Sequence, residues 1–151
     1  FGVPSRESQA AVTDSTIFEI GSISKMFTTT LAAFAHVTSK LSLDEHPGRY
    51  VLRPQGRPID RATLLHPGTY TVGGRPLQFP DRVGDDSSAL VDFHAWKAVA
   101  PPAKVRQYSN PSNGLLGVGT AVALKGRFAR LIETQVLPLC AWRRRTRSWI
   151  S

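Results

Sequence analysis

The sequence is poor in cysteine, in acidic residues and in long apolar runs. Cys140 is its single cysteine, so no internal disulfide can form and the redox compartment cannot be argued from cysteine usage. No histidine pair has the H-x-H or H-E-x-x-H spacing typical of a metal site, and Gly117-Val118-Gly119 lacks the strand-turn-helix context of a dinucleotide site. No apolar stretch is long enough to cross a membrane. We therefore expect no metal, no cofactor and no membrane-spanning segment.

Acidic residues are outnumbered, 11 Asp and Glu against 19 Lys and Arg, which gives a net charge of +8. Half of this excess comes from residues 139–151, which carry four arginines and two of the three tryptophans, so that +8 minus 4 leaves +4. Such a tail is compatible with a nucleic-acid or membrane-surface arm. The alternative is a tail without a selected function, for example the product of a reading-frame shift. We favour the frameshift and expect no nucleic-acid partner.

The tetrad Ser22-Ile23-Ser24-Lys25 opens an amphipathic stretch. Residues 17–20 are apolar and favour a strand or an extended segment, Gly21 breaks the run, and the apolar positions then recur at helical spacing through Val37. Ser22 and Lys25 would lie on one face of this helix, within reach of each other. The helix N-terminus favours negative charge, which suits an oxyanion formed when Ser22 attacks a carbonyl. The alternative makes Ser22 an N-cap and Lys25 a solvated charge.

A second cluster, Tyr108-Ser109-Asn110, lies 86 residues after Ser22 and precedes Pro111 and an apolar helix that ends near Gly126. A tyrosine beside Lys25 could accept the proton of Ser22, because a nearby cation favours the phenolate. The amide of Asn110 can donate and accept hydrogen bonds. The alternative is a packing aromatic at 108 and a helix cap at 110.

Four segments of the chain resemble class C serine β-lactamases. They are Phe18-Glu19-Ile20-Gly21-Ser22-Ile23-Ser24-Lys25, Thr69-Tyr70-Thr71-Val72-Gly73-Gly74, Pro76-Leu77-Gln78-Phe79-Pro80-Asp81 and Tyr108-Ser109-Asn110-Pro111-Ser112. The resemblance covers about residues 1–138. It implies that Ser22 is the acylated nucleophile, Lys25 its electrostatic partner and Tyr108 a general base, with Gln78 and Asn110 contacting the amide side chain of the substrate. Whether Lys25 or Tyr108 takes the first proton stays open.

The same resemblance implies an α+β fold of the β-lactamase and penicillin-binding-protein type. Residues 1–138 would form a partial domain, mainly the nucleophile helix and the helical subdomain, and most sheet strands would be absent; Phe1-Gly2-Val3 resembles a strand end. The first residue is not Met and no signal stretch is present, so we expect a processed, clipped or incomplete N-terminus. The family's third motif, Lys-Thr-Gly or a close variant, does not occur in the sequence.

Three departures from the family pattern fall inside the matched region. His66-Pro67-Gly68 replaces a usual Leu-Ala segment, and a proline within a helix costs about 3 kcal/mol. Arg75 replaces a usual leucine, and Asn113 replaces a usual apolar residue, where a buried amide without partners costs about 1–3 kcal/mol. These changes concern the stability of the helical subdomain rather than the chemistry.

The resemblance implies a periplasmic enzyme that hydrolyses penicillins or cephalosporins and works as a monomer when intact. A serine DD-peptidase or esterase of the same superfamily is the closest alternative. A non-catalytic remnant that associates with itself or with chaperones through exposed apolar surface is the other. Because the third motif is missing, we expect little or no turnover by this chain.

Overall fold

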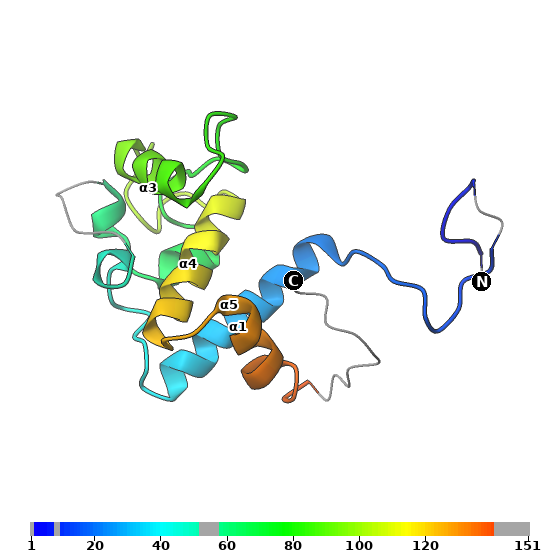
Figure 1. Ribbon diagram of the computed structural model, residues 1–151. Helices are drawn as coiled ribbons and strands as arrows, with labels where there is room; N and C mark the ends of the chain where they lie inside the picture. Colours follow the sequence, from blue (N-terminus) through cyan, green and yellow to red (C-terminus); the bar gives the residue numbers. More distant parts are fainter. Residues whose placement is uncertain (1, 8–9, 52–57, 141–151) are drawn as a thin grey trace.

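A computed structural model describes residues 2–7, 10–51 and 58–140 of the protein. All regular elements within these ranges are helical, and none of these residues forms a strand (Figure 1). Residues 17–20 are therefore not a strand, and Ile20 already has helical backbone angles. Gly2 and Val3 are not in a strand either, and Phe1 lies outside the described residues. This helical composition is what the sequence predicts for a part of the β-lactamase fold that lacks most of its sheet.

The described chain has five α-helices, and its longest connections are residues 70–85 and 96–109. A short 3₁₀ turn η1 (Gly21–Ile23) runs into helix α1 (Ser24–Val37), and the turns η2 (Pro47–Arg49) and η3 (Pro58–Arg61) precede α2 (Leu65–Thr69). Helices α3 (Asp86–Ala95) and α4 (Asn110–Ala123) come next, and α5 (Phe128–Leu131) continues into a π-helical turn η4 (Ile132–Val136). The longest two helices, α1 and α4, have 14 residues each. Residues 10–20 form an arm that extends away from the helices (Figure 1).

Helices α1 and α4 form the centre of the molecule and pack against each other. A glycine permits this close approach, because a Cβ at Gly117 would lie 3.3 Å from the Thr28 side chain of α1 and 3.2 Å from the Phe128 ring. One core cluster lies along this contact, and a second lies between α4, α3 and the η3 segment. Their buried members are Ala32, Ala35, Leu41, Leu64 and Leu116 in the first, and Ile59, Ala62, Val72, Phe93 and Leu115 in the second. These clusters hold α1 and the start of α4 in fixed relation.

Helix α2 accommodates the unusual His66-Pro67-Gly68 segment without the expected penalty. Leu64 is the N-cap residue, so Pro67 stands in the first turn, where a backbone N–H has no intrahelical acceptor in any case. The cost of an interior proline therefore does not apply. The helix ends after five residues at Tyr70, which adopts a left-handed conformation with φ 62°.

Helix α3 begins at an aspartate cap. The side chain of Asp85 accepts a hydrogen bond of 2.7 Å from the Ser88 N–H, and the Ser88 hydroxyl in turn accepts from the Asp85 N–H. The helix is also joined to the preceding loop, because its Asp92 forms ion pairs with Arg75 and Arg82. Arg75, the residue that replaces a family leucine, is consequently buried with a counter-ion.

Candidate active site

Ser22 and Lys25 form the contact that their spacing predicts. The ammonium of Lys25 donates a hydrogen bond of 3.1 Å to Ser22 Oγ. Ser22 lies in η1 and is exposed, whereas the N-cap position of α1 is occupied by Ile23, which makes no side-chain cap. The N-cap alternative for Ser22 is therefore wrong. The neighbouring Ser24 hydroxyl is used differently, since it donates a 2.7 Å hydrogen bond to the Gly21 carbonyl.

Tyr108 lies beside this pair, at the end of the loop that leads into α4. Lys25 Nζ is 5.2 Å from the centroid of the Tyr108 ring, and the tyrosine is 38% exposed. A hydrogen bond from the Ser22 hydroxyl, followed by one from Lys25, lowers the pKa of Tyr108 below its usual 10.0. The three side chains from two distant segments thus share one site, in which Ser22 lies beside a phenol that is easier to ionise than normal.

The helix that follows Tyr108 is capped by its neighbour rather than by Asn110. The Ser109 hydroxyl accepts a hydrogen bond of 3.2 Å from the Ser112 N–H, while Asn110 and Pro111 are the first residues of α4. The cap alternative for Asn110 is therefore wrong. Because Ser109 is fully buried, this cap fixes the direction in which Tyr108 enters the site.

Tyr70 is a further residue of the site that the sequence reasoning did not single out. Its ring lies 4.9 Å from the Tyr108 ring, centroid to centroid, at an angle of 45°, and the Arg106 guanidinium lies 5.5 Å from the Tyr70 centroid. The Gln107 N–H donates to the Tyr70 carbonyl at 2.9 Å, which ties the two tyrosine segments together. Burial, and then the nearby Tyr108, raise the pKa of Tyr70. The segment that contains Tyr70 is one of the four that resemble the family, but the sequence alone assigned this tyrosine no role in the site.

The two residues expected to contact the substrate amide are joined through their backbones but line different cavities. The Asn110 N–H donates a 2.9 Å hydrogen bond to the Leu77 carbonyl, next to Gln78. The Oδ1 atom of Asn110 is buried without a hydrogen-bond partner, and this residue lines a cavity of about 330 Å³ between α3 and α4. Gln78 is exposed and lines a separate cavity of about 190 Å³. Their shared contact with a substrate stays a prediction.

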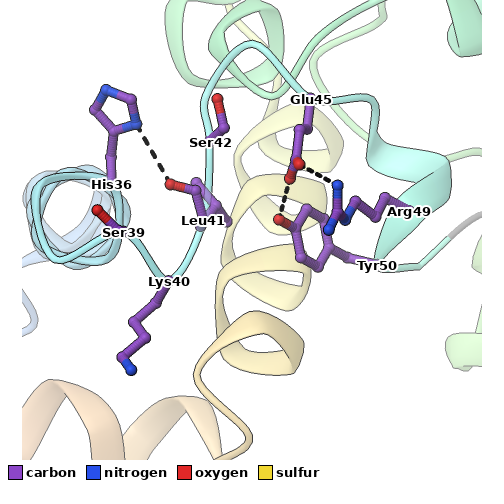
Figure 2. Close-up of a pocket in the computed structure, with 8 residues that line it drawn as sticks. All are labelled: His36, Ser39, Lys40, Leu41, Ser42, Glu45, Arg49 and Tyr50. Carbon is purple, nitrogen blue, oxygen red and sulfur yellow. Dashed lines mark hydrogen bonds and ion pairs between the residues drawn. The ribbon is translucent and has the colours of Figure 1, made fainter.

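A third cavity, of about 300 Å³, lies at the C-terminal end of α1, and several of its polar groups bind one another. Figure 2 shows the Glu45 carboxylate directed at the Arg49 guanidinium and the Tyr50 hydroxyl, both of which donate to it. His36 Nδ1 lies 3.3 Å from the Leu41 carbonyl. This arrangement stabilises the turn after α1 and offers no activated nucleophile. Within residues 2–7, 10–51 and 58–140, no group of three His, Cys, Asp or Glu side chains could hold a metal ion.

Comparisons with known proteins identify the family of the chain. A family model described as beta-lactamase matches residues 1–144 of the chain. The chain belongs to the beta-lactamase family. A beta-lactamase from Lysobacter lactamgenus is 42% identical over 138 residues, which are 91% of this chain and 36% of that protein. The chain thus spans little more than a third of the length of this relative of the family.

Solved structures identify the class within the beta-lactamase family. A class C beta-lactamase from Rhodobacter sphaeroides superposes with a TM-score of 0.82 at 41% identity, over 91% of this chain and 39% of that one. A beta-lactamase/D-alanine carboxypeptidase from Pseudomonas syringae gives a TM-score of 0.83 at 36% identity, with the same coverage. The class C resemblance and the fold predicted from the sequence are confirmed.

Among the residues that the structure describes, no helix is long and apolar enough to cross a membrane.

Proposed function

We propose that the chain carries the nucleophile half of a serine β-lactamase, and that Ser22 is acylated by β-lactams such as penicillins and cephalosporins. The observation that supports this most strongly is the joint contact of Ser22 with Lys25 and Tyr108. A serine hydroxyl is a weak nucleophile unless a neighbouring base removes its proton. Here the phenol of depressed pKa supplies that base, and the ammonium at 3.1 Å stabilises the developing charge.

The reaction follows from these positions. Ser22 Oγ attacks the lactam carbonyl carbon, and its proton passes to the group that is deprotonated at that moment, either Tyr108 as phenolate or Lys25 as amine. The same group then gives this proton to the ring nitrogen as the C–N bond breaks. An ester on Ser22 results. Water activated by Tyr108 then cleaves the ester, returns the proton to Ser22 and releases the opened lactam as an acid. The backbone N–H of Ser22 is one donor to the oxyanion. Gln78 and Asn110 would contact the amide side chain of the substrate.

Turnover by these 151 residues alone is expected to be very low. The sequence contains no Lys-Thr-Gly motif, which in the family supplies a cation for the substrate carboxylate on a strand that also bears an oxyanion donor. Acylation depends on Ser22, Lys25 and Tyr108. Substrate binding and deacylation depend on these residues and also on the strand that carries the Lys-Thr-Gly motif in the family. A slow, long-lived adduct is therefore the expected product. We place the whole protein in the periplasm, because the relatives are bacterial beta-lactamases.

Mass spectrometry tests the nucleophile directly. Incubation of the folded chain with benzylpenicillin should add the mass of one intact penicillin, and peptide mapping should locate it on Ser22. The Ser22→Ala variant should form no adduct. The Ser24→Ala variant is the matched control, since Ser24 lies two residues away and donates to a backbone carbonyl instead; it should still be acylated. A folded chain that gains no mass would overturn the enzymatic proposal for this chain.

A carboxypeptidase acting on peptides that end in D-alanine is the second candidate. It is supported by the similarity to the beta-lactamase/D-alanine carboxypeptidase of Pseudomonas syringae. The two activities share the acyl-enzyme step but differ in the leaving group, which is the tethered ring nitrogen in one case and free D-alanine in the other. Release of D-alanine from a D-alanyl-D-alanine peptide, lost in Ser22→Ala, would favour the second candidate.

A non-catalytic remnant is the remaining alternative, and the exposed arm before η1 is the observation that favours it. Ile17 and Phe18 are 65% and 61% exposed, and Ile20 and Ile23 are also exposed. Apolar surface of this kind promotes association. Sedimentation should then show oligomers that dissociate when Ile17 and Phe18 are both changed to Ser. A monodisperse chain that forms the penicillin adduct would exclude this alternative.

A further inference from the structure

Arg75 is a buried cation that the chemistry of Ser22 does not use. The residue is only 2% exposed, and its guanidinium forms an ion pair with Asp92 of α3. It also lies against three aromatic rings, at 4.6 Å from the centroid of Phe93, 5.3 Å from that of Phe79 and 5.4 Å from that of Trp96. Burial lowers the pKa of Arg75, but an arginine keeps its charge at neutral pH.

The charge around Asp92 is not balanced. Its Oδ2 atom accepts from Arg75 and its Oδ1 atom accepts from Arg82 at 2.6 Å, so two guanidinium groups share one carboxylate. The cluster therefore carries a net charge of +1. The Nε–H of Arg75 is buried without a hydrogen-bond partner, and the side chain of Arg82 is 68% exposed. Buried donors normally have an acceptor, so a ligand acceptor near this Nε–H would satisfy it.

A cavity of about 190 Å³ adjoins this cluster. Pro76, Pro80, Ala95 and the Trp96 side chain form its apolar walls, whereas Arg75 and Arg82 bring the excess cation and Gln78 an amide. Asp92 is the acidic residue of the lining, and both of its oxygens are already engaged. An apolar chamber with one cationic edge is suited to a small molecule that is apolar at one end and anionic at the other.

We propose that this cavity binds a small amphiphilic carboxylate. The hydrocarbon part would lie against Trp96 and the prolines, and the carboxylate would accept hydrogen bonds from Arg82 and Gln78 while the buried charge of Arg75 stabilises it. The site does not depend on acylation of Ser22. It depends on Arg75, whose guanidinium makes no contact with Ser22, Lys25 or Tyr108 among the interactions described above.

Nuclear magnetic resonance on the full chain tests the site, with benzoate as the probe. The indole N–H signal of Trp96, assigned through its loss in Trp96→Phe, should shift and saturate with a dissociation constant on the order of 1 mM. Benzamide has the same shape without the charge, and should produce little shift at the same concentration. Equal shifts with benzamide and benzoate would overturn the proposal, because they would show that the cationic edge contributes nothing.

Two arginine variants of equal charge separate a local site from general attraction. Arg82→Gln should weaken benzoate binding by about fivefold to tenfold, whereas Arg127→Gln, at an exposed arginine on the N-cap of α5, should leave it unchanged. The double variant Arg75→Leu with Asp92→Asn removes the buried cation together with its counter-ion, and should abolish saturable binding while the chain stays folded. Unaltered affinity in both Arg82→Gln and this double variant, or an equal loss in Arg127→Gln, would contradict the site.

Discussion

Lys25 holds Ser22 by a single 3.1 Å hydrogen bond from its ammonium to the serine Oγ. The two residues belong to different elements, since Ser22 lies in η1 and Lys25 in the first turn of α1. The junction between these elements therefore sets the distance between nucleophile and cation. Tyr108 then reaches the same hydroxyl from the loop before α4, so the site depends on the packing of α1 against α4.

The tyrosines should ionise in two groups. The sequence has three, and the pKa of Tyr108 is lowered from 10.0 by the Ser22 hydroxyl and then by Lys25, whereas burial raises the pKa values of Tyr50 and Tyr70 above 10.0. A spectrophotometric titration should show one phenolate forming below pH 10 and two above it. Tyr108→Phe should remove the early step, and Ser22→Ala should move it to higher pH. An early step that survives in Tyr108→Phe would contradict the assignment.

This shift also predicts how Tyr108 links stability to pH. Its pKa is lower in the folded state than in the unfolded chain, so its contribution is complete above pH 10 and disappears as the pH falls through the lowered pKa. Between these two pH values, the free energy of unfolding of the natural chain should rise with pH more steeply than that of Tyr108→Phe. Urea titrations of both proteins across this window measure the difference, and identical slopes would count against the shift.

The buried amide of Asn113 should cost stability. Asn113 is 5% exposed and its Nδ2 has no hydrogen-bond partner. It lies one turn before Gly117, on the face of α4 that meets α1. Asn113→Leu, which restores an apolar group of similar size, should raise the free energy of unfolding by about 1 kcal/mol. Asn113→Asp at neutral pH should lower it instead. Urea denaturation gives both signs, and a loss of stability in Asn113→Leu would contradict the prediction.

Breaking the Arg75–Asp92 pair from one side should be far more harmful than removing it altogether. Asp92→Asn leaves the buried guanidinium without a counter-ion and should lower the free energy of unfolding by about 3 kcal/mol. The double variant Arg75→Leu with Asp92→Asn removes the charge as well, and should recover most of that loss. Thermal or urea unfolding of the single variants Asp92→Asn and Arg75→Leu and of the double variant completes the cycle. If the loss of stability in the double variant equals the sum of the two single losses, the two side chains do not interact and the prediction is wrong.

Gly73 should tolerate no side chain. Its φ is +110°, and an added Cβ would lie 2.2 Å from the Ala100 carbonyl oxygen, a backbone atom that cannot rotate away. Gly73→Ala should therefore cost about 2 kcal/mol or more. Gly84→Ala is the control, because a Cβ there would meet nothing within 4 Å; its stability should change by less than about 0.5 kcal/mol. Equal stability of the two variants would refute the clash.

The local sequence predicted much of the helical framework. The periodicity after Gly21 and the Ser109-Asn110-Pro111 start each led to a helix that the structure contains, because these signals act within one or two turns. The contact between Lys25 and Ser22 followed from the same short-range geometry. Helix ends were less accurate, since α4 stops at Ala123 before Gly126.

What the sequence could not supply were contacts between distant segments. Tyr70 belongs to the site because its ring contacts the Tyr108 ring, although 38 residues separate the two in the chain. Nothing in the sequence around Tyr70 indicates this contact. Arg75 was expected to destabilise the helical subdomain. In the structure its guanidinium contacts Asp92 and three aromatic rings, which only the folded chain brings together. The roles of Gln78 and Asn110 and the nature of residues 139–151 stay predictions; residues 141–151 lie outside the described residues.

The hydrogen bond from the Asn110 N–H to the Leu77 carbonyl has a mechanical consequence. It joins the loop that carries Gln78 to the first residue of α4. Asp92 of α3 binds the same loop through its ion pairs with Arg75 and Arg82. A displacement of α4 would carry Gln78 and Asn110 in the same direction, although 32 residues separate them in the chain. The relative position of the Gln78 and Asn110 segments is thus set by the packing of α4 as well as by the loop itself.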